Sequence, residues 1–119
     1  MEIKIVDYKG INVAEVISDS VVIKTTQDAL DLMADCGYQG ADRIIIHERN
    51  LNPEFFDLKT KLAGDILQKF STYRTRLAII GTFSKYPSRS LRDFIYESNK
   101  SGQILFLENE EEAINRIVK

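Results

Sequence analysis

Hydrophobic and polar residues alternate at the start of the chain, which is the pattern of a half-buried strand. Residues 2–8 and 12–18 both alternate in this way, and Lys9-Gly10 between them is typical of a tight turn. The pattern therefore predicts two strands joined as a β-hairpin. Residues 21–23, three β-branched residues in succession, predict a third short strand.

Farther along, apolar residues recur at intervals of three and four and predict four helices. The first is expected to end near Cys36, with Gly37 as its stop signal, and Asn52-Pro53 is expected to open a turn or short helix. Each helix is preceded by a side chain that can accept a hydrogen bond from the first turn. These expected caps are Thr25 or Thr26, Asp57, Ser88 or Ser90, and Asn109.

Three unbroken apolar runs predict strands buried on both faces. They lie at residues 43–47, 77–83 and 103–107, and each alternates with a helix. This order predicts one α/β domain over residues 1–119, with an N-terminal β-hairpin, a mainly parallel sheet and four helices. Periodicity does not determine the order of the strands in the sheet.

Composition and charge exclude several classes of function. The 119 residues carry a net charge of −2, with a pI near 5.4, which gives no general attraction to nucleic acid or anionic membranes. A single cysteine and a single histidine form neither a disulfide nor a zinc site, and we expect Cys36 to be a buried, unreactive thiol. No cofactor or metal is predicted. The charged N-terminus and the lack of an apolar run long enough to span a membrane predict a cytoplasmic protein.

Candidate chemistry follows from one rule: open α/β sheets bind ligands outside the carboxyl ends of their parallel strands. Residues 83–93 lie there, and their cations at the start of a helix predict either a small-anion site or a capped, solvated loop. The histidine and glutamate that end the first buried strand suit acid–base chemistry, but neighbouring strand residues point to opposite faces, so no catalytic residue is assigned. The candidate ligand- or partner-binding residues are His47, Glu48, Arg49, Asn50, Ser84, Lys85, Tyr86, Arg89 and Arg92.

Several segments resemble one bacterial family. They are AEVISDS, DALDLMADCGYQGADRIIIHERNL, FFDLKTKLAGDILQKFSTYRTRLAIIG, FSKYPSRSLRDFIYESNKSG and the final EEAI. Together they cover nearly the whole chain and resemble the family called domain of unknown function 4180, which has no assigned activity.

The layout also resembles the STAS (SpoIIAA-like) fold of anti-sigma-factor antagonists and, more loosely, SEC14-like lipid-binding modules. In the antagonists a serine that follows an aspartate at a helix start is phosphorylated to control partner binding. Here Asp57 matches the aspartate, but Leu58 and Lys59 replace the serines. The resemblance therefore leaves Thr60 as the one candidate phosphorylation site.

The sequence favours a non-enzymatic regulatory or protein-interaction module that binds a protein partner or a second copy of itself. Phe55 and Phe56 are expected to lie mainly in the core. Two alternatives stay open. One is a small-molecule or anion-binding domain, including an enzyme, at the carboxyl ends of the parallel strands. The other is a structural homodimer subunit.

Overall fold

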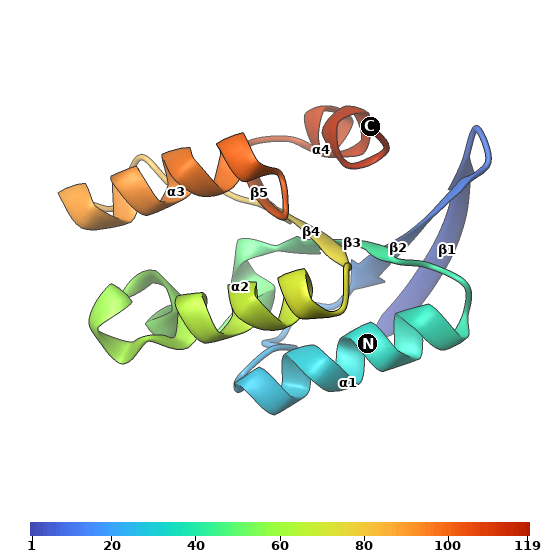
Figure 1. Ribbon diagram of the computed structural model, residues 1–119, viewed down its shortest axis with the longest axis horizontal. Coiled ribbons are helices and arrows are strands. Elements are labelled where there is room, and N and C mark those ends of the chain that lie inside the picture. Colours follow the sequence, from blue (N-terminus) through green and yellow to red (C-terminus); the bar gives the residue numbers. More distant parts are fainter.

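A computed structural model describes all residues from 1 to 119 and shows an α/β domain built on one five-stranded sheet (Figure 1). The strands lie in chain order across the sheet, β1-β2-β3-β4-β5. Only the first pair is antiparallel, and the other three pairs are parallel. The strand bounds are β1 Glu2–Tyr8, β2 Ile11–Ile17, β3 Arg43–His47, β4 Arg76–Ile80 and β5 Ile104–Leu107. The expected hairpin and mainly parallel sheet are confirmed.

Four α-helices connect or follow the parallel strands. Their bounds are α1 Thr26–Tyr38, α2 Leu62–Thr72, α3 Arg89–Ser101 and α4 Glu110–Ile117. Three expected caps are confirmed, because Thr25, Ser88 and Asn109 each accept a hydrogen bond from the first turn of the helix that follows. Helix α1 continues through Gly37 to Tyr38, slightly farther than expected. None of these helices has the length and apolar character needed to cross a membrane.

The helices cover the two faces of the sheet unequally. Residues from α1, α2 and α3 pack against one face in a cluster of 21 buried residues that includes Ile44, Ile46 and Leu77. On the other face, α4 packs alone against the strands, in a cluster of eight buried residues that includes Ile45 and Ala78 of the sheet and Ala113 of the helix. Figure 1 shows α4 on the opposite side of the strands from α1 and α2. Alternate residues of the apolar strands therefore enter two separate cores.

Residues 21–23 do not form the expected strand. Ile23 makes only an isolated parallel bridge to Leu51, and the backbone N–H groups of Val22 and Ile23 both donate to the carbonyl of Asn50. The segment thus pairs with chain that lies beyond the end of β3 rather than with a strand of the sheet. Its β-branched composition reflects burial of Ile23, which is fully enclosed.

The expected long helix from Asp57 is divided into two parts. Asp57 caps a single 3₁₀ turn, Leu58–Thr60, and Lys61 then adopts a left-handed backbone conformation with φ of 66°. Helix α2 begins only after this turn, without a side-chain cap. The Thr60 hydroxyl donates to the carbonyls of Glu54 and Asp57, both at 2.8 Å, and this closed turn separates the two parts.

Side chains of α3 close the outer edge of the sheet at β5. The Asn99 side chain donates to the Phe106 carbonyl at 3.2 Å and accepts from the Phe106 N–H at 2.7 Å. Ser98 donates to the Ile104 carbonyl at 2.6 Å. The backbone of β5 therefore has hydrogen-bond partners on both sides, β4 on one and side chains of α3 on the other. This arrangement protects the edge strand from pairing with another chain.

Candidate functional site

Glu48 lies at the centre of the polar contacts outside the carboxyl ends of β3 and β4. Its carboxylate accepts a hydrogen bond from the Tyr86 hydroxyl and pairs with the Lys85 ammonium at 2.8 Å. The backbone N–H of Thr82 donates to it at 3.3 Å. These contacts tie the loop after β4 to the end of β3. The structure thus brings together Glu48, Lys85 and Tyr86, three of the residues expected at this edge.

A glycine makes the position of Glu48 possible. A Cβ atom added to Gly81 would lie 2.6 Å from Oε1 of Glu48 and 2.7 Å from its Cβ, closer than real Cβ contacts. The strand expected over residues 77–83 ends at Ile80. Gly81 begins the loop after β4, and the Glu48 side chain packs against it. Sequence reasoning missed this role, since an isolated glycine after a strand gives no sign of what packs on it.

Aromatic rings extend the cluster into the core. The ring of Phe56 stacks on that of Tyr86, with centroids 4.8 Å apart and an interplanar angle of 11°. Phe83 lies 5.9 Å from Phe56, and Phe106 of β5 lies 5.3 Å from Phe83. Phe55 and Phe56 are both buried, so the expectation that they are core residues is confirmed.

A hollow of about 370 Å³ opens beside this cluster. Its walls combine apolar side chains with the exposed Arg49 and with Lys85, whose side chain is 56% exposed. The 3₁₀ turns Glu48–Asn50 and Pro53–Phe56 shape one side of it, and the loop after β4 shapes the other. The apolar walls come from Val21, Leu51, Pro53 and Phe56.

The charge of Glu48 is balanced by its own neighbours in the chain. Burial raises the pKa of Glu48, but hydrogen bonds from Lys85, Tyr86 and Thr82 outweigh it and hold the pKa below its usual value. The glutamate is therefore an anion at neutral pH, a poor proton acceptor with its oxygens already occupied. Burial and the hydrogen bond to Glu48 raise the pKa of Tyr86, so the phenol stays neutral.

His47 lies on the opposite face of the sheet from Glu48. It follows Ile45 in the strand alternation and belongs to the face that α4 covers. Burial, followed by the nearby Arg49, lowers its pKa, so the imidazole is mainly neutral at pH 7. The two residue types that suited acid–base chemistry thus do not converge, as the alternation of strand residues predicted.

Asn50 is held entirely by the chain itself. Its side chain is fully buried, its amide donates to the carbonyls of Ser18 and Ser20 at 2.9 Å, and its oxygen accepts from the His47 N–H at 2.9 Å. Both amide hydrogens are used. We therefore interpret Asn50 as the fastening between the end of β2 and the end of β3 rather than as a ligand-binding residue.

The loop from Ser84 to Arg92 is an exposed, capped helix start. The Ser88 hydroxyl accepts from the N–H of Leu91 at 3.2 Å, and the expected cations are dispersed. Lys85 is engaged with Glu48, whereas Arg89 and Arg92 are exposed on α3. Exposed Ser84 makes no side-chain hydrogen bond within the chain. No group of three acidic, histidine or cysteine side chains that could hold a metal ion occurs in the structure.

Cys36 is fully buried in α1. Burial, with a smaller contribution from Asp35, raises the pKa of its thiol to about 11. The expectation of a buried, unreactive thiol is thus supported by its environment.

The fold defines the class to which the protein belongs. It is similar in structure to a Thermotoga maritima protein described as a candidate anti-sigma factor antagonist, with a TM-score of 0.52 at 14% sequence identity. The match covers 99% of this chain and 94% of that one. The likeness shows a STAS-like, SpoIIAA-like α/β fold, as the sequence predicted.

Sequence comparison then gives the family. The model of the family described as "Domain of unknown function (DUF4180)" matches residues 8–117, and the chain belongs to that family. Among proteins with curated descriptions, none matches the sequence significantly. The expected family resemblance is therefore confirmed.

Proposed function

We propose that the protein is a regulatory module that binds another protein at the carboxyl edge of its parallel strands. The observation that carries the proposal is the Glu48–Lys85–Tyr86 cluster. The cluster holds together the two loops that form the walls of a hollow with apolar and cationic side chains. Its hydrogen bond and ion pair occupy the carboxylate, the phenol and the ammonium that catalysis would need. The fold of the Thermotoga maritima protein, described as a candidate anti-sigma factor antagonist, supports a regulatory role.

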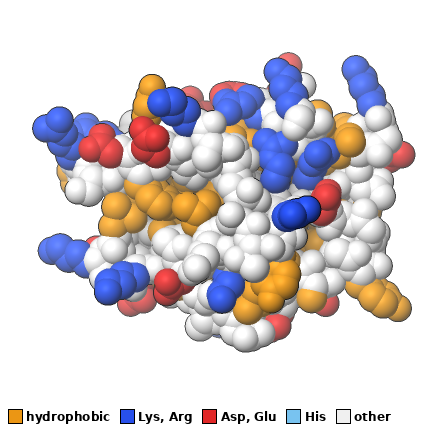
Figure 2. All heavy atoms as spheres, in the orientation of Figure 1, with side chains coloured by type: hydrophobic (Ala, Val, Ile, Leu, Met, Phe, Trp, Pro, Cys, Tyr) orange, Lys and Arg blue, Asp and Glu red, His pale blue; other side chains and the backbone are white.

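Apolar side chains are also exposed elsewhere on the surface. Figure 2 shows hydrophobic side chains exposed between α2 and α3. Several apolar residues of α2, α3 and the loops before them are only partly buried, although they pack against the main core. They include Leu58, Leu62, Phe83, Phe94 and Ile95. Contiguous apolar surface beside a polar rim is typical of a protein interface.

Charge indicates the kind of partner. Arg49 at the hollow, with Arg89 and Arg92 at the start of α3, are exposed cations, and Lys85 keeps more than half of its side chain exposed. Within the hollow Glu48 is the single acidic residue, and it is already paired with Lys85. We therefore propose a partner segment in which an acidic side chain lies next to an apolar one.

Thr60 stays a candidate for phosphorylation on this surface. Its oxygen accepts from the N–H of Leu62 at 3.3 Å, at the start of α2, where a phosphate would be favoured by the helix dipole. The same hydroxyl donates to two carbonyls of the preceding turns, so a phosphate would remove those hydrogen bonds. We propose that such a change would loosen the turn that borders the partner surface.

Photo-crosslinking in the native cell tests the proposal. A photoreactive residue replaces Arg49 at the hollow, and in a control it replaces Glu111, which is exposed on α4. The expected result is one dominant protein adduct from position 49 and none from position 111. The purified partner should then bind about tenfold more weakly to Arg49→Glu, while Lys4→Glu, a charge reversal on β1, leaves binding unchanged.

Two results would overturn this proposal. One is the absence of any adduct at position 49, and the other is a partner that binds Arg49→Glu as tightly as the wild type. Either result would show that the carboxyl edge is not the interface. An adduct with a second copy of the chain would favour self-association, and the molar mass in solution would then decide between a transient and an obligate dimer.

A further inference from the structure

The amino ends of the parallel strands carry a second, separate cluster of charge. Arg43 begins β3 and Arg76 begins β4, and the two residues are direct partners in the strand register. Partners in register place their side chains on the same face of a sheet. Arg116, in the last turn of α4, is close enough that it and Arg43 both contribute to lowering the pKa of Arg76, after burial.

No aspartate or glutamate side chain forms an ion pair with any of these three arginines. The one ion pair of the structure is that between Lys85 and Glu48, at the other end of the strands. Figure 2 shows lysine and arginine side chains gathered below the C-terminal end of α4. Asp42 is the acidic group near this cluster, and it raises the pKa of Arg76 by less than burial and the two other arginines lower it.

Two of the arginines, Arg76 and Arg116, have structural roles. The Arg76 guanidinium donates to four carbonyls, those of Gly102, Arg116, Ile117 and Lys119, at 2.8 to 3.2 Å. Arg116 donates to the Asn99 carbonyl at 3.2 Å. These contacts hold the end of α4 against the sheet and explain both residues without a ligand.

Arg43 has no such role. Its Nη1 is buried and has no hydrogen-bond acceptor, the single buried side-chain nitrogen or oxygen of the structure in that state. A buried donor without an acceptor destabilises a protein, and more so when it is charged. Arg43 thus has hydrogen-bonding capacity that the chain does not use.

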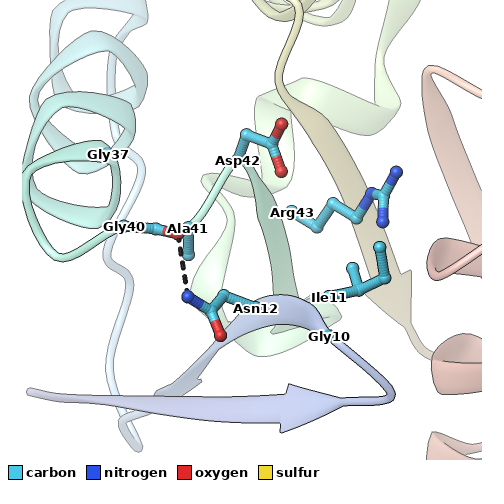
Figure 3. A pocket seen from close by; sticks show the side chains of 8 residues that line it. All are labelled: Gly10, Ile11, Asn12, Gly37, Gly40, Ala41, Asp42 and Arg43. Carbon is cyan, nitrogen blue, oxygen red and sulfur yellow. Dashed lines mark hydrogen bonds between the residues drawn. The ribbon is translucent and has the colours of Figure 1, made fainter.

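A hollow of about 460 Å³ lies at the same position (Figure 3). Two loops border it, the β1–β2 turn with Gly10 and the α1–β3 loop with Gly40, and Asn12 joins them by donating to the Gly40 carbonyl at 3.2 Å. A Cβ atom on Gly10 would meet no other atom within 4 Å, so the hollow is open there. In Figure 3 the Arg43 side chain extends past Ile11, on the far side of the hollow from Gly37.

We propose that this hollow binds a small molecule through an oxyanion group, a phosphate monoester or a carboxylate, and that Arg43 is its main contact. A guanidinium donates two parallel hydrogen bonds to two oxygens of such a group. Binding turns the Arg43 guanidinium toward the hollow and gives Nη1 its acceptor. Arg76 and Arg116 raise the local positive potential without contacting the ligand. Asp42, exposed at the rim, disfavours a second negative group on that side.

Titration followed by NMR tests the site directly on the whole chain. Wild-type protein is titrated with inorganic phosphate in one arm and with citrate in another, each against sodium chloride at equal ionic strength. The expected result is a saturable shift of the Arg43 side-chain Nε–H signal with at least one oxyanion and none with chloride. Stronger binding of phosphate indicates a phosphate ester as the ligand, and stronger binding of citrate indicates a carboxylate.

Variants give the second readout. Arg43→Gln removes the charge and the forked donor, and should weaken the binding constant by about tenfold or more. Lys4→Gln removes an exposed cation of β1, outside both proposed sites, and should leave binding within about twofold. Arg43→Lys keeps the charge but loses the fork, so it should bind with intermediate strength.

Either of two results overturns the proposal. One is an Arg43 signal that moves no more with phosphate or citrate than with chloride. The other is an Arg43→Gln variant that binds as tightly as Lys4→Gln. The site lies at the opposite end of the strands from the proposed partner surface, so failure here leaves that proposal untouched.

Discussion

The two ends of the parallel strands treat charge in opposite ways. At the carboxyl end, Glu48 receives an ammonium, a phenol and a backbone N–H, and each group of the cluster has its counterpart. At the amino end, Arg43 and Arg76 lie in register without a carboxylate partner, and one guanidinium nitrogen is buried without an acceptor. The carboxyl end has more residue types that could take part in catalysis, but their polar groups bind one another. The free hydrogen-bonding capacity lies at the amino end, on Arg43.

Consequently, the polar groups that the chain satisfies and the unpaired Arg43 should respond differently to substitution. Residues at the carboxyl end stabilise the fold, because their polar groups are satisfied within the chain. Arg43 at the amino end should contribute little to stability, since its charge is unpaired. Measurements of the free energy of unfolding on single variants can sharpen or break this contrast.

The largest effect is expected for Asn50→Ala. The change removes the hydrogen bonds to the carbonyls of Ser18 and Ser20 and the one from the N–H of His47, while Arg49 still donates to the Ser18 carbonyl at 3.3 Å. Three lost hydrogen bonds at about 1 kcal/mol each predict a loss of roughly 3 kcal/mol in urea unfolding. Asn115→Ala, on the exposed side of α4, is the matched control and should change stability by less than about 0.5 kcal/mol. Equal effects of the two changes would contradict a fastening role for Asn50.

Arg76→Gln should have the next largest effect. It removes a guanidinium that donates to the carbonyls of Gly102, Arg116, Ile117 and Lys119. We expect a loss of about 2 kcal/mol, with faster amide hydrogen exchange confined to α4. Unchanged exchange in α4 would show that its end is held by apolar packing alone.

Glu48→Gln should destabilise the protein by about 1 kcal/mol, and only where the carboxylate is charged. The pKa of Glu48 is lowered by folding, so its contribution is present above the usual value of 4.5 and is lost as the pH falls through the folded pKa. The stability difference between wild type and variant should therefore shrink on acidification from pH 6 to the acid limit of the fold. Glu97→Gln, exposed on α3, is the matched control and should change stability by less than about 0.5 kcal/mol. A stability difference that grows as the pH falls would contradict a lowered pKa of Glu48 in the folded protein.

Arg43→Gln should have the smallest effect on stability, and of the opposite sign. Removing an unpaired, partly buried charge should leave the free energy of unfolding unchanged or raise it by up to about 0.5 kcal/mol in chloride buffer. Arg92→Gln serves as the exposed control. A loss of more than about 1 kcal/mol for Arg43→Gln would show that Arg43 has a structural role after all.

The sequence predicted features that depend on neighbouring residues. A helix cap can be predicted because the cap and its helix lie within a few positions of each other. The three expected caps Thr25, Ser88 and Asn109 are all confirmed. The buried strands and their parallel order likewise follow from local apolar runs and the alternation with helices. Lys61 escaped prediction because a left-handed lysine, unlike a glycine, carries no signal in its residue type.

Features that depend on distant residues could not be predicted. Residues 21–23 have the composition of a strand, but their hydrogen-bond acceptor is the Asn50 carbonyl. Glu48 meets Tyr86 across 38 positions, and the glycine that admits its carboxylate follows another strand. The pairing of Arg43 with Arg76 requires the register of two strands that periodicity does not supply.

A crystal structure from phosphate buffer tests the contrast between the two ends most directly. The account predicts an ordered phosphate in contact with the Arg43 guanidinium at the amino end. It predicts none on the Ser84–Arg92 loop, where Lys85 is already paired with Glu48. A phosphate bound on that loop, with Arg43 unoccupied, would contradict the account and return the anion site to the carboxyl end.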